Sequence, residues 1–279
     1  MDNYLYDVAR RLIAFDTVSS KSNRPAIDYL AGELEPLGFH VAIQTAELLG
    51  VPQANLIAWI GPEQRTGLII SGHVDTVPFE GQPGWTCDPL KLTVQDDRLY
   101  GRGTSDMKGF IAQCLAAARG LNTATLKRPL VFLFTASEEV GCLGAARAAT
   151  ELSQTLGETP MPHLAWIGEP TSYAICHAHK SIVSFEIIVR GIGGHSGAPA
   201  RGVNAIAVMA RAIEAVGQLQ EERRSAAHPE FSAIFPDAPT DVLNFGTING
   251  GLAANIIAEE CRLRISYRSM PDADPMALY

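Results

Sequence analysis

Up to about residue 180, short apolar runs alternate with longer stretches in which apolar residues recur every three or four positions. Short apolar runs bounded by turn residues are typical of buried strands, and the periodic stretches are typical of amphipathic helices. This pattern predicts helices at 1–15, 24–37, 107–121 and 141–156, and strands at 39–46, 54–61, 66–72, 128–137 and 162–168. Strands and helices that alternate every thirty residues or so indicate a largely parallel sheet covered by helices.

The pattern changes after residue 180. It predicts strands at 181–191, 241–250 and 255–269, a long helix at 202–222, and a Pro- and Ala-rich loop at 226–240. We therefore expect two domains, with the boundary near His179. Residues 1–179 form an α/β domain with a mixed, mostly parallel sheet flanked by helices, and residues 180–279 form a smaller α+β domain with an antiparallel sheet.

Composition narrows the classes of protein that fit. A chain of 279 residues with 47% hydrophobic content can fill a core, and its 30 acidic against 22 basic residues give a net charge of -8. That charge disfavours nucleic-acid and anionic-membrane partners. There is no signal peptide pattern, no apolar run near the ~18 residues of a membrane span, and no C-x-x-C pair. A cytoplasmic protein without disulfides is the expectation.

Metal-binding residue types stand where the predicted strands end. They are His73 and Asp75 after the strand at 66–72, Glu138 and Glu139 after 128–137, Glu169 after 162–168, and Asp106 just before the helix at 107–121. In such folds, ligands bind at the carboxyl ends of the strands. One histidine with several carboxylates and no sulfur suits Zn²⁺, with Co²⁺ or Mn²⁺ also possible by ligand type.

Each of these motifs taken alone has a simpler explanation. An isolated H-x-D is weak, a Glu-Glu pair often begins a helix, and Asp106 could be an N-cap. Their coincidence at successive strand ends favours a metal site, and the number of carboxylates favours two ions. Cys142, next to the Glu pair, is expected to be a small buried residue, and His177 and His179 are expected to be structural.

Five segments together resemble the M20 family of metallo-aminoacylases and peptidases. They are SGHVDTVP, YGRGTSDMKGF, TASEEVGCLGA, IGEPT and GIGGHSGAPARGVNAI, in the family's order and over essentially the whole chain. The resemblance implies a zinc-peptidase-like fold with a small lid and dimerisation domain. It also implies a dinuclear zinc enzyme that hydrolyses the amide of an N-acyl amino acid by metal-activated water.

The resemblance also implies roles for the residues at the strand ends. His73 and Glu169 would hold one metal, Glu139 the other, and Asp106 would bridge them. Asp75 would accept the second ring N–H of His73, and Glu138 would be the general base. The Asp106–Met107 peptide bond is expected to be cis.

Three further roles fall in the second domain. His195, in GGHSGAP, is similar to the family histidine that stabilises the oxyanion in a partner subunit's site, which implies a homodimer through the small domain. Asn255 and Arg268 match positions that hold the substrate's carboxylate, for which an arginine fork is well suited.

The chain departs from the family pattern in one respect. The family supplies a further histidine ligand from a stretch that returns to the catalytic domain, whereas no histidine follows His228 here. We therefore expect the C-terminal return segment to be absent, the small domain to be incomplete, and strand edges to be exposed.

The resemblance is strongest to family members that deacetylate N-acetyl-L-ornithine in arginine biosynthesis. Alternatives within the family are succinyl-diaminopimelate desuccinylase and other aminoacylases or carboxypeptidases. The alternative of another class is a non-catalytic M20-like binding protein or an inactive fragment.

Overall fold

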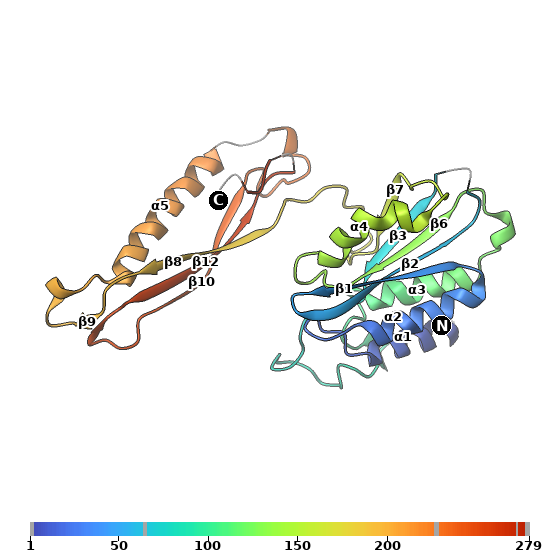
Figure 1. The fold of residues 1–279 in the computed structure, drawn as a ribbon, viewed down its shortest axis with the longest axis horizontal. Coiled ribbons are helices and arrows are strands. Elements are labelled where there is room, and N and C mark those ends of the chain that lie inside the picture. The colour runs from blue at the N-terminus through green and yellow to red at the C-terminus, as the bar shows by residue number, and fades with distance from the viewer. Residues whose placement is uncertain (1–2, 64–65, 226–228, 272, 277–279) are drawn as a thin grey trace. The chain divides into compact units, whose positions relative to one another are not determined.

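The chain divides into two compact units, Met1–Tyr173 and Ala174–Tyr279. The computed structural model (Figure 1) describes residues 3–63, 66–225, 229–271 and 273–276. His228 and part of the loop predicted at 226–240 lie outside the described residues. The division falls slightly before the predicted boundary near His179, and no described helix is long and apolar enough to cross a membrane.

The first unit is built on a five-stranded mixed sheet. Its strands are, in spatial order, β1 (His40–Leu48), β2 (Val51–Ile60), β6 (Leu130–Thr135), β3 (Leu68–His73) and β7 (Leu164–Ile167). β1, β2 and β6 pair antiparallel, whereas β6, β3 and β7 pair parallel. The parallel part therefore consists of the three strands that precede the candidate metal ligands.

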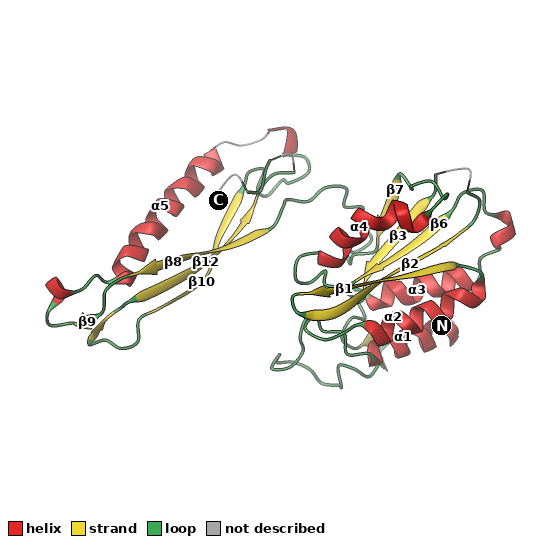
Figure 2. Cartoon of the chain, viewed as in Figure 1, coloured by secondary structure: helices red, strands yellow, loops and turns green. Residues whose placement is uncertain are grey.

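Helices cover both faces of this sheet, which confirms the predicted α/β class (Figure 2). α1 (Asn3–Ala14), α2 (Arg24–Leu34) and α3 (Lys108–Arg119) lie on one face, and α4 (Leu143–Leu156) lies on the other. The chain moves one way along the sheet from β3 to β6 and back past β3 to β7. Right-handed crossovers then place α3 and α4 on opposite faces and bring the ends of all three strands to one edge.

Short elements complete the first unit. The predicted helix at 24–37 is divided at Pro36, so that α2 is followed by a 3-10 turn, η1 (Glu35–Leu37), which ends at Gly38 with a left-handed φ of 87°. Between β3 and α3 a hairpin of β4 (Thr93–Gln95) and β5 (Arg98–Tyr100) was not predicted, and η2 (Thr123–Thr125) precedes β6.

The second unit is an α+β arrangement with an antiparallel sheet. Its strands are β10 (Val242–Gly250), β12 (Glu260–Arg268) and β8 (Val183–Arg190), in that order. α5 (Ala205–Ser225) packs on one face through Met209 against Leu263 and Ile265. The predicted strand at 255–269 is two strands, because β11 (Ile256–Ile257) pairs instead with β9 (Gly194–His195). The turns η3 (Pro199–Arg201) and η4 (Pro229–Phe231) flank α5.

The outermost strand β7 exposes its apolar side chains. All four of its residues are exposed, with Leu164 at 66% and both Trp166 and Ile167 at 59%. An exposed apolar edge strand offers unpaired backbone groups to another strand and favours self-association.

Replacing Leu164 with lysine is therefore expected to reduce self-association, because a charge on an edge strand opposes strand pairing. Light scattering across a concentration series should show association beginning at a several-fold higher concentration, with a change in stability within about 0.5 kcal/mol. The control is Leu49→Lys, an equally apolar residue that is 73% exposed in the turn between β1 and β2. Equal effects of both substitutions would contradict a specific role of the β7 edge.

Candidate metal centre

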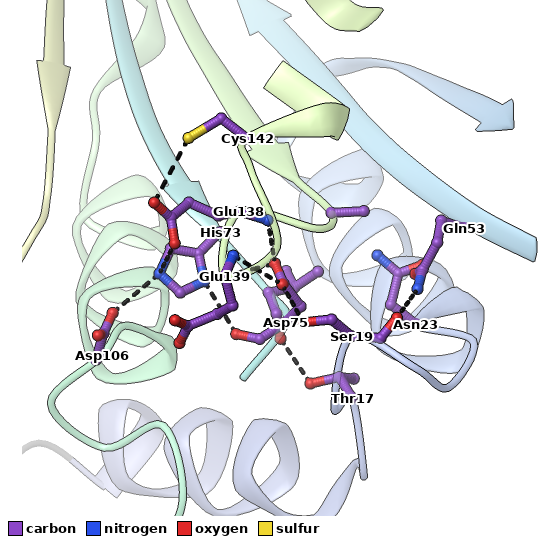
Figure 3. Close-up of polar contacts among 12 residues, drawn as sticks. Thr17, Ser19, Asn23, Gln53, His73, Asp75, Asp106, Glu138, Glu139 and Cys142 are labelled. Atoms are coloured by element: carbon purple, nitrogen blue, oxygen red, sulfur yellow. Dashed lines mark hydrogen bonds and ion pairs between the residues drawn. The ribbon is translucent and has the colours of Figure 1, made fainter. Parts of the chain in front are cut away.

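Three predicted metal ligands, His73, Asp106 and Glu139, lie together at the carboxyl edge of the parallel strands (Figure 3). His73 is the last residue of β3, and Glu138 and Glu139 lie in the turn between β6 and α4. Asp106 lies just before α3, and its peptide bond to Met107 is cis, as the family resemblance implies. Glu169 follows β7.

His73 is at the centre of the cluster. Its side chain is 1% exposed, and its Nε2 lies 2.9 Å from Asp106 Oδ1 and 3.8 Å from a carboxylate oxygen of both Glu138 and Glu169. Two groups with the chemistry of metal ligands share this histidine: His73 with Glu138 and Glu139, and His73 with Asp106 and Glu169. Within each group the ligand atoms lie within 4.8 Å of one another.

The second ring nitrogen of His73 contacts the main chain. Nδ1 lies 2.9 Å from the Asp75 carbonyl oxygen but 3.6 Å from the Asp75 carboxylate, which is beyond hydrogen-bond distance. The Asp75 carbonyl oxygen is therefore the nearer acceptor for this N–H, while the Asp75 carboxylate lies within ion-pair distance of the ring. With its proton on Nδ1, His73 donates to the carbonyl and keeps Nε2 free for a metal.

The Asp75 carboxylate instead holds the turn that carries the two glutamates. It is completely buried and accepts hydrogen bonds from Ser19 Oγ at 2.7 Å and from the main-chain amides of Glu138 and Glu139 at 3.0 and 3.3 Å. Burial opposes its ionisation, but the contacts with His73, Ser19 and the Glu138 amide outweigh burial and lower the pKa of Asp75. Asp75 therefore stays ionised and fixes the glutamate turn.

The concentration of negative charge shifts the other groups. Burial, and then repulsion from neighbouring carboxylates, raises the pKa of Glu139 and of Glu169. For His73, burial disfavours the imidazolium, but the attraction of Asp75, Asp106 and Glu169 prevails and raises its pKa to about 9. Such a cluster favours a bound cation, and one imidazole with carboxylate oxygens fits Zn²⁺, Co²⁺ or Mn²⁺.

Cys142 is exposed, which corrects the expectation that it is buried. It adopts a left-handed backbone conformation, with φ 55°, directly before α4. Its Sγ lies 3.6 Å from Glu138 Oε1. Partial desolvation and the nearby Glu138 charge raise the pKa of the thiol to about 11, so a thiolate ligand is disfavoured at neutral pH.

The candidate residues of the second unit lie in two separate places. His195 in β9 pairs with Ile256 in β11. Asn255 directly precedes Ile256, and its carbonyl oxygen accepts a hydrogen bond from the Ser196 amide at 3.0 Å. Arg268 is the last residue of β12. All three are exposed. Because β12 rises about 3.4 Å per residue over its length, Arg268 lies at the far end of the strand from Asn255.

Sequence patterns did not reveal two residues that support the site, Ser19 and Asn55. Ser19 lies in a loop and carries no signal. Asn55 is a polar residue inside an otherwise apolar run at 54–61, and it is 3% exposed in β2. A polar residue at a buried strand position requires hydrogen-bond partners, so this exception to the pattern could have identified it.

Comparison with known proteins supports the family resemblance. Residues 69–269 match the sequence profile of peptidase family M20/M25/M40. The chain is 42% identical over 95% of its length to an acetylornithine deacetylase of Klebsiella pneumoniae, and 41% identical over 92% to one of Yersinia pseudotuberculosis. It covers 67% and 64% of these relatives, so it spans about two thirds of their length.

Solved structures share the fold at low sequence identity. An M20 family metallo-carboxypeptidase from Sulfolobus solfataricus matches all of this chain and 74% of its own, with a TM-score of 0.73 and 18% identity. A dinuclear metal-binding peptidase of the M20 family from Bacillus subtilis matches 96% of this chain and 64% of its own, with a TM-score of 0.57 and 16% identity. With the profile match and the relatives above 40% identity, these findings show that the chain belongs to peptidase family M20/M25/M40.

Proposed function

We propose that this chain forms the metal centre of a cytoplasmic hydrolase that deacetylates N-acetyl-L-ornithine in arginine biosynthesis. One observation carries the proposal. Two groups of metal-binding side chains meet at His73, and their residues lie within the part of the chain that matches the family. The choice of substrate is supported by relatives at 41–42% identity that are named acetylornithine deacetylase.

The site would hold two zinc ions, or Co²⁺ or Mn²⁺ by ligand type. We propose that His73 and Glu169 bind one ion, that Glu139 binds the other, and that Asp106 lies between them as a shared ligand. Bound metals of this kind polarise an acyl carbonyl and lower the pKa of water. Asp106 Oδ1 is the carboxylate oxygen closest to His73 Nε2, at 2.9 Å, so it lies next to the ligand atom that the two groups have in common.

Glu138 has the position of a proton carrier. Its side chain is 35% exposed and its Oε2 lies 3.8 Å from His73 Nε2, so Glu138 faces both the ligand cluster and solvent. Asp75 accepts a hydrogen bond from the Glu138 amide. Among the described residues, His73 is the only cationic group that forms an ion pair with the Glu138 side chain. We assign it the transfer of a proton from the attacking water to the leaving amine.

The second unit would supply groups for the substrate. We propose that His195 stabilises the oxyanion in the site of a partner subunit, within a homodimer formed through this unit, and that Asn255 and Arg268 bind the substrate's carboxylate. Their exposure supports contact with a substrate or another subunit. Because His195 and Asn255 lie together while Arg268 lies at the other end of β12, the Asn255 and the Arg268 that hold one carboxylate would come from different subunits of the homodimer.

The Glu138→Gln variant tests the proton carrier. Loss of a general base should lower kcat for N-acetyl-L-ornithine by about 10²–10⁴-fold, while elemental analysis still finds two metal ions. The control is Glu80→Gln, a 76% exposed carboxylate outside both ligand groups. Succinyl-diaminopimelate and a dipeptide assayed in parallel distinguish the related activities. Two bound metals without turnover of any of these substrates would instead indicate a binding protein.

The Asp106→Ala variant tests the shared ligand. Because Asp106 is proposed to bind both ions, its loss should weaken both metal sites, whereas Glu169→Ala should mainly weaken one. Elemental analysis after dialysis should find close to no zinc in the first variant and about one ion in the second. His163→Ala, an exposed histidine outside both groups, is the control. Full metal content in Asp106→Ala would contradict the proposed centre.

Metal binding should release protons near neutral pH. In the metal-free protein His73 is largely protonated below its pKa of about 9, so a metal must displace that proton, and affinity should rise up to about tenfold per pH unit toward pH 9. Titration calorimetry in buffers of different ionisation enthalpy measures the released protons. Proton release that is the same in wild type and His73→Gln would contradict this assignment.

The same shift predicts the stability of the metal-free protein. The pKa of His73 is raised from 6.5 when the protein folds, so its stabilising contribution is fully present below pH 6.5 and is lost as pH rises through about 9. Thermal unfolding of metal-free protein should therefore show a lower Tm at pH 9.5 than at pH 6.5, and His73→Gln should reduce this difference.

A further inference from the structure

The turn between β6 and α4 is the segment that carries both Glu138 and Glu139. Within the turn, the Glu138 carbonyl accepts the amides of Gly141 and Cys142 at 2.9 and 3.0 Å. Ser137 adopts a left-handed φ of 56°. Such a tight turn has few conformations that satisfy its backbone groups, so the groups that hold its two ends decide where the glutamates lie.

Asn55 holds both ends of this turn from the neighbouring strand β2. Its Oδ1 accepts the Ala136 amide at 3.0 Å, and its Nδ2 donates to the Gly144 carbonyl at 2.8 Å and to Gln44 Oε1 at 2.9 Å. Ala136 precedes the glutamates and Gly144 follows them. The Gly144 amide also donates to the Ala136 carbonyl at 3.0 Å, which closes the loop behind the glutamate pair.

The fit around Asn55 is close. A Cβ added to Gly144 would lie 2.3 Å from the Ala136 carbonyl oxygen and 2.6 Å from Asn55 Oδ1, so glycine is required there. Asn55 and Ala136 are 3% and 1% exposed. Removal of the Asn55 amide would leave the Ala136 N–H and the Gly144 carbonyl buried with fewer partners, and the turn would shift to recover hydrogen bonds.

We propose that Asn55 is a positioning residue for the glutamate pair. Asp75 holds the turn through the amides of Glu138 and Glu139, and Asn55 holds its two ends through Ala136 and Gly144. Asn55 belongs to neither ligand group, and it acts only through the main chain. The effect on catalysis rests on the proposed function, whereas the effect on the geometry of the turn does not.

The test compares Asn55→Ala with Asn23→Ala. Asn23 is a matched control, because it is completely buried and its amide likewise accepts from and donates to the main chain of β2, at Ala54, with both distances 2.8 Å. Three quantities are measured: Tm, hydrogen exchange of the peptide that spans residues 136–144, and zinc affinity by competition with a chelator. Both variants should lose Tm to a similar extent.

Only Asn55→Ala should change the turn. We expect exchange in residues 136–144 to rise about tenfold or more, zinc affinity to fall about 10–100-fold, and kcat to fall more than KM changes. Exchange and zinc affinity within twofold of wild type in Asn55→Ala would overturn the proposal, as would equal changes in Asn23→Ala.

The Asn55→Asp variant provides a second measurement should Asn55→Ala fail to fold. Aspartate keeps the acceptor for the Ala136 amide but loses the donor to Gly144, so exchange should rise at the Gly144 side of the turn more than at the Ala136 side. Uniform exchange across the turn would contradict the two-ended arrangement. If wild type binds no zinc, the proposed function fails, and the exchange measurements still decide the role of Asn55.

Discussion

The buried carboxylate of Asp75 is the group on which the geometry of the site depends. A carboxylate without solvent must be hydrogen-bonded, because an unpaired buried charge is very costly. Asp75 meets this requirement with Ser19 from the N-terminal loop and with the amides of Glu138 and Glu139 from the turn after β6. The hydrogen bonds that this buried carboxylate needs therefore connect the end of β3 with the turn that follows β6.

The same arrangement brings together charges that repel one another. Burial, and then repulsion from neighbouring carboxylates, raises the pKa of Glu139 and of Glu169, so full ionisation of the cluster is disfavoured. The sheet beneath the cluster is apolar, with Val131, Phe132 and Phe134 of β6 at most 1% exposed. A tightly packed scaffold of this kind resists the rearrangement that would relieve the repulsion. The packing of the core thus keeps the carboxylates together despite their repulsion, and a bound cation would reduce that repulsion.

The sequence predicted which candidate ligands lie close together better than it predicted the contacts among them. His73, Glu138 and Glu169 follow apolar runs, and the ends of parallel strands meet at one edge, so their proximity could be inferred. The main-chain contact of His73 and the exposure of Cys142 depend on turn conformations that apolar periodicity does not encode. Likewise the antiparallel pairing of β2 with β6 joins segments far apart in sequence, and only the folded sheet shows that Asn55 reaches the glutamate turn.

The segment that carries Asp106 is also held by a buried polar side chain, in this case a lysine. Lys108, the first residue of α3, is 1% exposed, and its Nζ donates to the Phe15 carbonyl at 2.8 Å just beyond α1. Burial lowers the pKa of Lys108 to about 7, so the amine can donate this hydrogen bond with less need for a buried countercharge. Asp106 lies just before α3, and the first turn of α3 is held to the segment that follows α1. The glutamate turn and the Asp106 loop are thus each held by a hydrogen bond between a buried side chain and the main chain of another segment, and the ligand side chains remain available for a metal.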